Sequence, residues 1–120
     1  MVRPALLVAE PEPPEALSTR KLVLETAKFN VLTAHSTEEA LETFALFPEC
    51  SAVVLVSSDT IDCERIVAAV RSANGRGKLP IIVLSPRIGF ACPGADYILP
   101  SHDPHPLVEL VRSLFGDPHS

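Results

Sequence analysis

Carboxylate and hydroxyl side chains stand directly after short apolar runs of the sequence. Asp59 lies three positions after AVVLV, Glu10 follows PALLVA, and Ser85 ends LPIIVLS. A short run rich in β-branched residues is typical of a buried strand. Ligands of an open parallel sheet bind just beyond the carboxyl ends of its strands. There, a carboxylate could hold Mg²⁺ or accept a phosphoryl group, and a serine could act as a nucleophile.

Each of these side chains also has a simpler interpretation. A single carboxylate gives little affinity for Mg²⁺, so Glu10 is interpreted first as a solvated acid at a strand end. No His–acid pair is indicated near Ser85, which favours a loop-capping role for its hydroxyl. Asp59 is interpreted as part of the turn into the next helix.

The histidines and cysteines do not predict a metal centre. His102 and His105 flank Asp103 and Pro104, and those two residues already explain the segment as a helix start. No Cys or further His lies nearby in sequence to complete a zinc site. The three cysteines are an odd number at wide spacing, which is typical of reduced thiols; they are Cys50, Cys63 and Cys92.

The composition indicates one acidic domain, residues 1–120. Apolar residues make up 47% of the 120 residues, which is enough for one hydrophobic core. The formal net charge of −5 argues against a nucleic-acid partner, because such a partner requires a basic face. No apolar run approaches the length of a membrane span, and the first residues lack the features of a signal peptide. We therefore expect a cytoplasmic protein without a membrane partner.

Apolar runs alternate with amphipathic segments along the whole chain. Strands are expected at residues 5–10, 30–35, 52–56, 79–85 and 95–99. Helices are expected over 15–29, from a Ser36–Glu39 capping box to Pro48, after a Thr60 cap, and after an Asp103 cap with Pro104 at the first position. The alternation predicts an α/β fold with a doubly wound, five-stranded parallel sheet in the order 2-1-3-4-5 and helices on both faces.

The fourth connection is too short for a full crossover helix. Only the eight residues PRIGFACP lie between Ser85 and Gly94, and they include a glycine and a proline. A parallel crossover normally needs about a dozen residues or more. Pro93 also disfavours a helical conformation at Cys92. We expect the fourth helix to be shortened or lost.

Local patterns along this order of elements resemble a known family. They are ALLVAE in the first strand, HSTEEALETF at the second helix, SAVVLV, LPIIVLS and GADYILP in the last three strands, and DPHPLVELVRSL at the last helix. Together they resemble the receiver domain of two-component response regulators over nearly the whole chain. The resemblance implies a flavodoxin-like receiver fold and a role in signal transduction.

The resemblance also implies where a phosphoryl-transfer site would lie. In the family, an aspartate ending the third strand accepts the phosphoryl group, and it holds Mg²⁺ together with two acids ending the first strand. A Ser or Thr ending the fourth strand and a Lys ending the fifth contact the phosphoryl oxygens. Here the acceptor position matches Val56, the acidic pair matches Ala9 and Glu10, and the last two positions match Ser85 and Ser101.

The mismatches imply a degenerate receiver, or pseudo-receiver. Val56 has no nucleophilic atom, and the lysine position holds Ser101. A one-residue shift would put Ser57 at the acceptor position, but it would also turn the side chains of the strand to the opposite face. The resemblance then implies a protein that is not an enzyme, has no Mg²⁺ cofactor, and acts by protein–protein interaction without phosphorylation.

Apolar residues outside the inferred core faces form a candidate partner surface. They are Leu17 and Leu22 on the first helix, and Val108 and Phe115 on the last helix. The partner would be another signalling protein or a second copy in a homodimer. Two alternatives remain open: a phosphorylatable receiver with a displaced acceptor such as Asp59, and a small ligand-binding module of flavodoxin-like architecture.

Overall fold

The structure, a computed structural model, describes residues 4–11, 19–73, 79–86, 92–101 and 103–116. The strands are β1 (Ala5–Ala9), β2 (Asn30–Ala34), β3 (Ala52–Val56), β4 (Ile81–Ser85) and β5 (Tyr97–Pro100). The helices are α1 (Thr19–Thr26), α2 (Thr37–Leu46), α3 (Cys63–Ser72) and α4 (His105–Phe115). In these ranges, no helix combines the length and the apolar character needed to cross a membrane.

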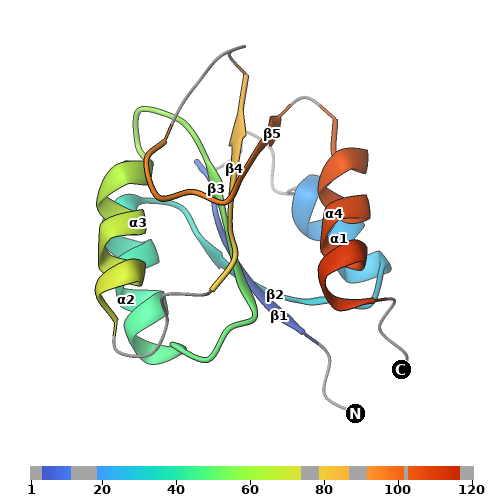
Figure 1. Ribbon diagram of the computed structural model, residues 1–120, viewed down its shortest axis with the longest axis horizontal. Coiled ribbons are helices and arrows are strands. Elements are labelled where there is room, and N and C mark those ends of the chain that lie inside the picture. The colour runs from blue at the N-terminus through green and yellow to red at the C-terminus, as the bar shows by residue number, and fades with distance from the viewer. Residues whose placement is uncertain (1–3, 12–18, 74–78, 87–91, 102, 117–120) are drawn as a thin grey trace.

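The five strands form one parallel sheet in the order β2-β1-β3-β4-β5. Helices α1 and α4 cover one face of the sheet, and α2 and α3 cover the other (Figure 1). The predicted doubly wound fold is therefore confirmed. The strand order changes direction beside β1, and this is where the crevice at the carboxyl ends of the strands opens in such sheets.

The two faces of the sheet bury two separate apolar clusters. In β3, Val53 and Leu55 belong to the cluster under α2 and α3, whereas Val54 and Val56 belong to the cluster under α1 and α4. Successive side chains of a strand point to opposite faces, so each strand contributes to both clusters. Because both faces are covered, β3 and β4 are buried along their whole length.

The start of α2 agrees with the predicted capping box, with one difference. The Glu39 backbone N–H donates to the Ser36 hydroxyl over 3.1 Å. The Glu39 carboxylate accepts from the backbone N–H of His35 over 3.0 Å, one residue before the cap. The side chain thus still satisfies a backbone donor just before the first turn.

The predicted Thr60 cap of the third helix is wrong, because Asp62 holds that position. The Asp62 carboxylate accepts from the Arg65 N–H over 3.1 Å. The Thr60 carbonyl instead accepts from the N–H and the hydroxyl of Thr37, over 3.1 and 3.0 Å. Thr60 therefore ties the turn before α3 to the first turn of α2.

The ends of α1 and α4 differ from the expected boundaries. Helix α1 ends at Thr26, before the predicted Phe29, because Lys28 adopts a left-handed conformation with φ 74°. The Phe29 N–H returns to the Leu24 carbonyl, which closes a Schellman motif. The N-cap of α4 is Pro104, one residue after the predicted Asp103, whose carboxylate accepts from the backbone N–H of the first helical residue over 3.0 Å. The predicted helix start at residue 15 lies outside the described residues.

The connection from β4 to β5 contains no helix in the residues that are described. Pro86 forms a bend and residues 93–94 form a turn, while residues 87–91 lie outside the description. The Arg71 guanidinium of α3 holds this connection by donating to the Gly94 carbonyl over 2.9 Å and to the Asp96 carboxylate over 2.8 Å. The same carboxylate accepts from the backbone N–H of Ile81 over 2.8 Å. Side chains therefore fix the start of β4 relative to the approach to β5.

Candidate functional site

Backbone pairing places the sequence-predicted site residues in one row at the carboxyl edge of the sheet. The β1–β3 pairing runs to Ala9, the β3–β4 pairing to Val56, and the β4–β5 pairing to Ser85. Ser101 continues the row, because its N–H donates to the Ser85 carbonyl over 3.1 Å. Glu10 lies at the other end, where its N–H donates to a carbonyl of β2 over 2.9 Å. The structure thus brings all five residues to the same edge.

Two positions of this row are apolar and buried. Ala9 is 0% exposed and Val56 is 5% exposed. Val56 packs into the cluster under α1 and α4, whereas the neighbouring Ser57 lines an open pocket. The side chains of Ala9 and Val56 can neither accept a phosphoryl group nor coordinate a metal ion, because they carry only carbon and hydrogen.

The two polar residues that match the family, Glu10 and Ser85, are also buried. Glu10 is 2% exposed, so its interpretation as a solvated acid is wrong. The residue continues β1 into the crevice, where the His35 ring Nδ1 lies 3.2 Å from the Glu10 carbonyl oxygen. Ser85 is 4% exposed and ends β4 inside the same layer.

A pocket of about 370 Å³ opens beside the row, in the turn that follows β3. Its lining consists of Ser57, Ser58, Asp59 and Pro86. The Ser58 hydroxyl lies 3.2 Å from the Thr60 hydroxyl, and the segment closes as a turn. These four described residues therefore offer hydroxyls and one carboxylate, and none of the four is a cation.

The side-chain donors of the described residues at the strand ends do not fit a Mg²⁺ site. Mg²⁺ requires near-octahedral oxygen ligands, usually with carboxylates directed at one point. Glu10 supplies a carboxylate in the row, and Asp59 belongs to the turn beyond β3. Ala9 and Val56 supply no side-chain ligand atom. Within the part of the chain that is described, no group of three or more His, Cys, Asp or Glu residues could hold a metal ion.

Several solved structures share this fold. The receiver domain of the sensor histidine kinase PA1611 from Pseudomonas aeruginosa PAO1 gives a TM-score of 0.79 at 15% identity, over 93% of this chain and 97% of that chain. The chemotaxis response regulator CheY4 of Vibrio cholerae gives 0.77 at 18% identity, over 95% and 100%. The chain has the fold of a response regulator receiver domain.

The likeness to receiver domains lies in the fold. The response regulator TrrA of Thermotoga maritima, in complex with Mg²⁺–BeF, gives a TM-score of 0.72 at 23% identity over 93% of this chain and 99% of that chain. The PA1611 receiver structure has a magnesium ion coordinated in its active-site cleft. No protein-family model and no curated protein matches the present sequence significantly.

The predicted partner surface of the receiver fold needs correction on α4. Val108 is 7% exposed and belongs to the core, so its placement off the core face is wrong. Phe115 is partly buried and packs against the same cluster. The apolar stripe of α4 is wider than the sequence pattern indicated, because neighbouring positions on the helix both reach the sheet. Leu17 lies outside the described residues. Leu22 belongs to α1, but its side chain is outside the description.

A groove between α1 and α4 lies close to that predicted surface. It has a volume of about 370 Å³ and is lined by Val23, Thr26, Ala27, Pro104, His105, Val108 and Arg112. The sequence did not indicate that the exposed residues Thr26 and His105 line one groove, because they lie on helices far apart in the chain. Only the packing of the two helices on one face of the sheet brings them together.

Cys63 and Cys92 are not activated as nucleophiles. All three cysteines are buried and unbridged. Burial, with smaller contributions from the nearby Cys92 and Asp62, raises the pKa of the Cys63 thiol to about 11. Burial also raises the pKa of Cys92. Both thiols therefore stay protonated near neutral pH, where an unreactive thiol acts as a small core side chain.

Proposed function

We propose that this chain is a degenerate receiver domain that acts in signal transduction by binding another protein, without phosphorylation. The observation that carries the proposal is Val56, a buried apolar side chain at the position that matches the phosphoacceptor of the family. Valine offers no atom that could form an acyl phosphate. The signalling state of the domain would then depend on the presence of its partner.

The charges around the row support the same proposal. Phosphoryl transfer depends on positioning and on neutralising negative charge. Ala9 stands in place of a metal-binding acid, and Ser101 stands in place of the lysine. Among the described residues, the neighbouring pocket adds the Asp59 carboxylate to this environment. The proposed mechanism therefore uses no Mg²⁺ and includes no catalytic step.

Intact-mass measurement tests the proposal directly. The protein should keep its mass after incubation with acetyl phosphate and Mg²⁺, because the acceptor, one acid and the lysine are all missing. A receiver domain with an intact acceptor serves as the positive control in the same buffer. A stoichiometric gain of one phosphoryl group would overturn the proposal.

A phosphorylatable receiver with a displaced acceptor is the second candidate. It is favoured by one observation, which is that Asp59 is exposed and lines the pocket next to Ser57 and Ser58. This candidate predicts a gain of mass that disappears in Asp59→Asn. If the gain persists in Asp59→Asn, another residue is the acceptor, and the assignment to Asp59 is wrong.

The groove between α1 and α4 is the proposed surface for the partner, which would be another signalling protein or a second copy. Thr26 is exposed and lines this groove, whereas the adjacent Glu25 is exposed and does not. Thr26→Arg should weaken self-association or partner capture, and Glu25→Arg should leave either unchanged. Sedimentation and affinity capture with mass spectrometry give the readout, after circular dichroism confirms folding. Equal binding by the two variants would exclude this groove.

A further inference from the structure

Two large apolar side chains are exposed next to each other where α2 ends. Leu46 is 75% exposed and Phe47 is 51% exposed. Neither is needed for the core, because Ala40 and Phe44 supply the buried stripe of the helix. Single exposed apolar residues are ordinary, but an adjacent pair beside a pocket is typical of an interaction surface.

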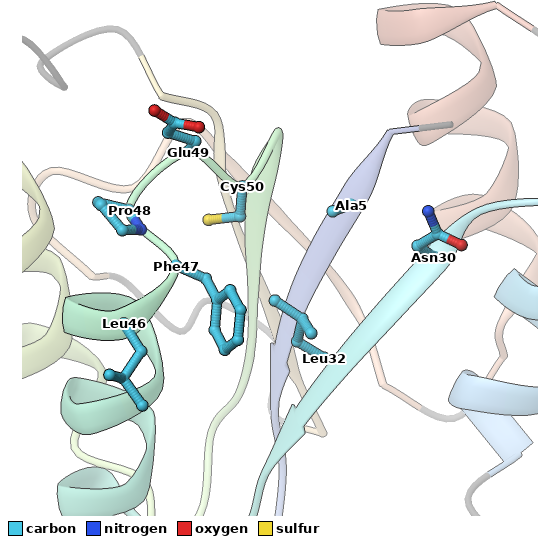
Figure 2. Close-up of a pocket in the computed structure, with 8 residues that line it drawn as sticks. All are labelled: Ala5, Asn30, Leu32, Leu46, Phe47, Pro48, Glu49 and Cys50. Atoms are coloured by element: carbon cyan, nitrogen blue, oxygen red, sulfur yellow. The ribbon is translucent and has the colours of Figure 1, made fainter. Parts of the chain in front are cut away.

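A pocket of about 660 Å³ lies directly beside this pair (Figure 2). Leu32 and Asn30 of β2 contribute to it from one side, together with Ala5 of β1. Leu46 and Phe47 contribute from the other side, and the Phe47 ring and the Leu32 side chain extend toward each other across it. The pocket is at the amino-terminal ends of β1 and β2, so it lies at the opposite end of the sheet from the row of site residues.

The pocket also borders an edge of the sheet. β2 is the outermost strand, and its pairing partner in the sheet is β1. Asn30 is exposed and Leu32 is half-buried, so this end of β2 is accessible from the α2 side. Edge strands present backbone donors and acceptors that an extended peptide can use.

The described charged residues at the end of α2, beside the pocket, are acidic. Helix α2 carries three glutamates and no cation, and Glu42 lies one turn before Leu46. Glu49 lines the pocket, and neither Glu42 nor Glu49 has an ion-pair partner among the described residues. The carbonyl end of α2 adds further negative potential at this place. Lys28, just before β2, is the described cation nearest in sequence to the lining residue Asn30.

We propose that this pocket binds an extended segment of another protein that carries a large apolar side chain flanked by lysine or arginine. The apolar side chain would fill the space between Phe47 and Leu32, and the cations would lie against Glu42 and Glu49 at the end of α2. A second copy is a poor occupant, because the chain itself has a net charge of −5. The proposal is independent of phosphorylation and of the groove between α1 and α4.

Selection from a random peptide library displayed on phage tests this proposal. The intact protein is the target, and the pool is depleted against Leu46→Ser/Phe47→Ser, which should fold normally because both side chains are exposed. Enriched peptides should share a large apolar residue next to lysine or arginine. Their binding should perturb the NMR amide signals of Leu32, Leu46 and Phe47.

Charge-reversal variants test whether the two glutamates contribute to binding of the peptide. Glu42→Lys and Glu49→Lys should each weaken the selected peptides about tenfold in Kd, because a complementary charge becomes a repulsive one. Two variants on other elements serve as controls. Glu109→Lys changes an exposed acid on α4, and Ile98→Ser changes an exposed apolar residue on β5. Both variants should bind the peptides as the unmodified protein does.

The selection would overturn the proposal if it enriched no peptides or enriched acidic ones. Equal affinity of the peptides for the Leu46→Ser/Phe47→Ser variant would overturn it too. So would NMR amide perturbations confined to α1 and α4. Dimerisation through Leu46 and Phe47, observed by sedimentation, would also overturn it in favour of a second copy.

Discussion

At the scale of single residues, the proposed function depends on Val56. Its side chain belongs to the core under α1 and α4, and it is 5% exposed. A valine at this position offers no phosphoacceptor atom and adds apolar surface to the core. The same position now contributes to stability, since burial of a valine side chain is worth about 1.5–3 kcal/mol.

Restoring an aspartate at this position should cost stability without restoring the reaction. Val56→Asp should lower the free energy of unfolding by about 2–4 kcal/mol, because it places a carboxylate where the surroundings are apolar. Denaturant titration gives this value, with Val56→Ala as the control for lost volume. Intact mass after treatment with acetyl phosphate and Mg²⁺ should stay unchanged until Ala9→Asp and Ser101→Lys are added. Full phosphorylation of the single variant would show that the remaining site is competent.

The buried thiol of Cys63 should make the fold sensitive to alkaline pH. Burial, with smaller effects of Cys92 and Asp62, raises the pKa of Cys63 from 9.0 to about 11. Between about pH 9 and pH 11 the folded chain therefore keeps a proton that the unfolded chain has lost. The stabilising contribution is complete below pH 9 and disappears as the pH rises through 11.

Urea titrations at a series of pH values measure this effect. The free energy of unfolding of the unmodified protein should fall more steeply above pH 9 than that of Cys63→Ala. Parallel curves for the two proteins would contradict the assignment of the effect to Cys63.

At the scale of elements, side chains hold the described part of the connection between β4 and β5. Arg71 bonds the Leu79 and Gly94 carbonyls over 2.8 and 2.9 Å, as well as the Asp96 carboxylate. Gly94 has a φ of 89°, and a Cβ atom there would lie 2.7 Å from Val67. The turn is therefore packed closely against α3. β5 is left with Ile98 43% exposed on the sheet edge.

Removal of this clamp should destabilise the protein more than removal of an exposed ion pair on the same helix. Arg71→Ala should lower the free energy of unfolding by about 2 kcal/mol, because the part-buried Leu79 carbonyl, the Gly94 carbonyl and the Asp96 carboxylate all lose donors. Arg65→Ala is the matched control, since Arg65 pairs with Glu38 at the surface and should cost at most about 1 kcal/mol. Equal losses in denaturant titrations would show that the clamp contributes no more than a surface pair.

At the scale of the whole molecule, two apolar clusters share one parallel sheet. β1, β3 and β4 are buried, whereas β2 and β5 form the edges and are more exposed. The central strands therefore carry the contacts that join the two faces. Both proposed binding surfaces lie outside this centre, one between α1 and α4 and the other beside β2.

Amide hydrogen exchange should reflect this arrangement. Amides of β3 and β4 should exchange only through global unfolding, and those of β5 should exchange faster through local opening. The difference in protection between β4 and β5 should be larger than in a sheet whose edge strand follows a complete crossover helix. Equal protection of β4 and β5 in an NMR exchange series would show that the connection is as rigid as the centre.

The sequence by itself determined the order of elements and the parallel sheet, because buried strands and amphipathic helices have different hydrophobic periods. The match of Val56 to the acceptor position comes from the family resemblance and stays a prediction. Only the tertiary structure decided the burial of Glu10 and Val108 and the role of Asp62 in place of Thr60. These depend on how neighbouring elements pack, which a local pattern does not contain. The pocket beside β2 likewise exists only because the end of α2 folds over strands that are distant in the chain.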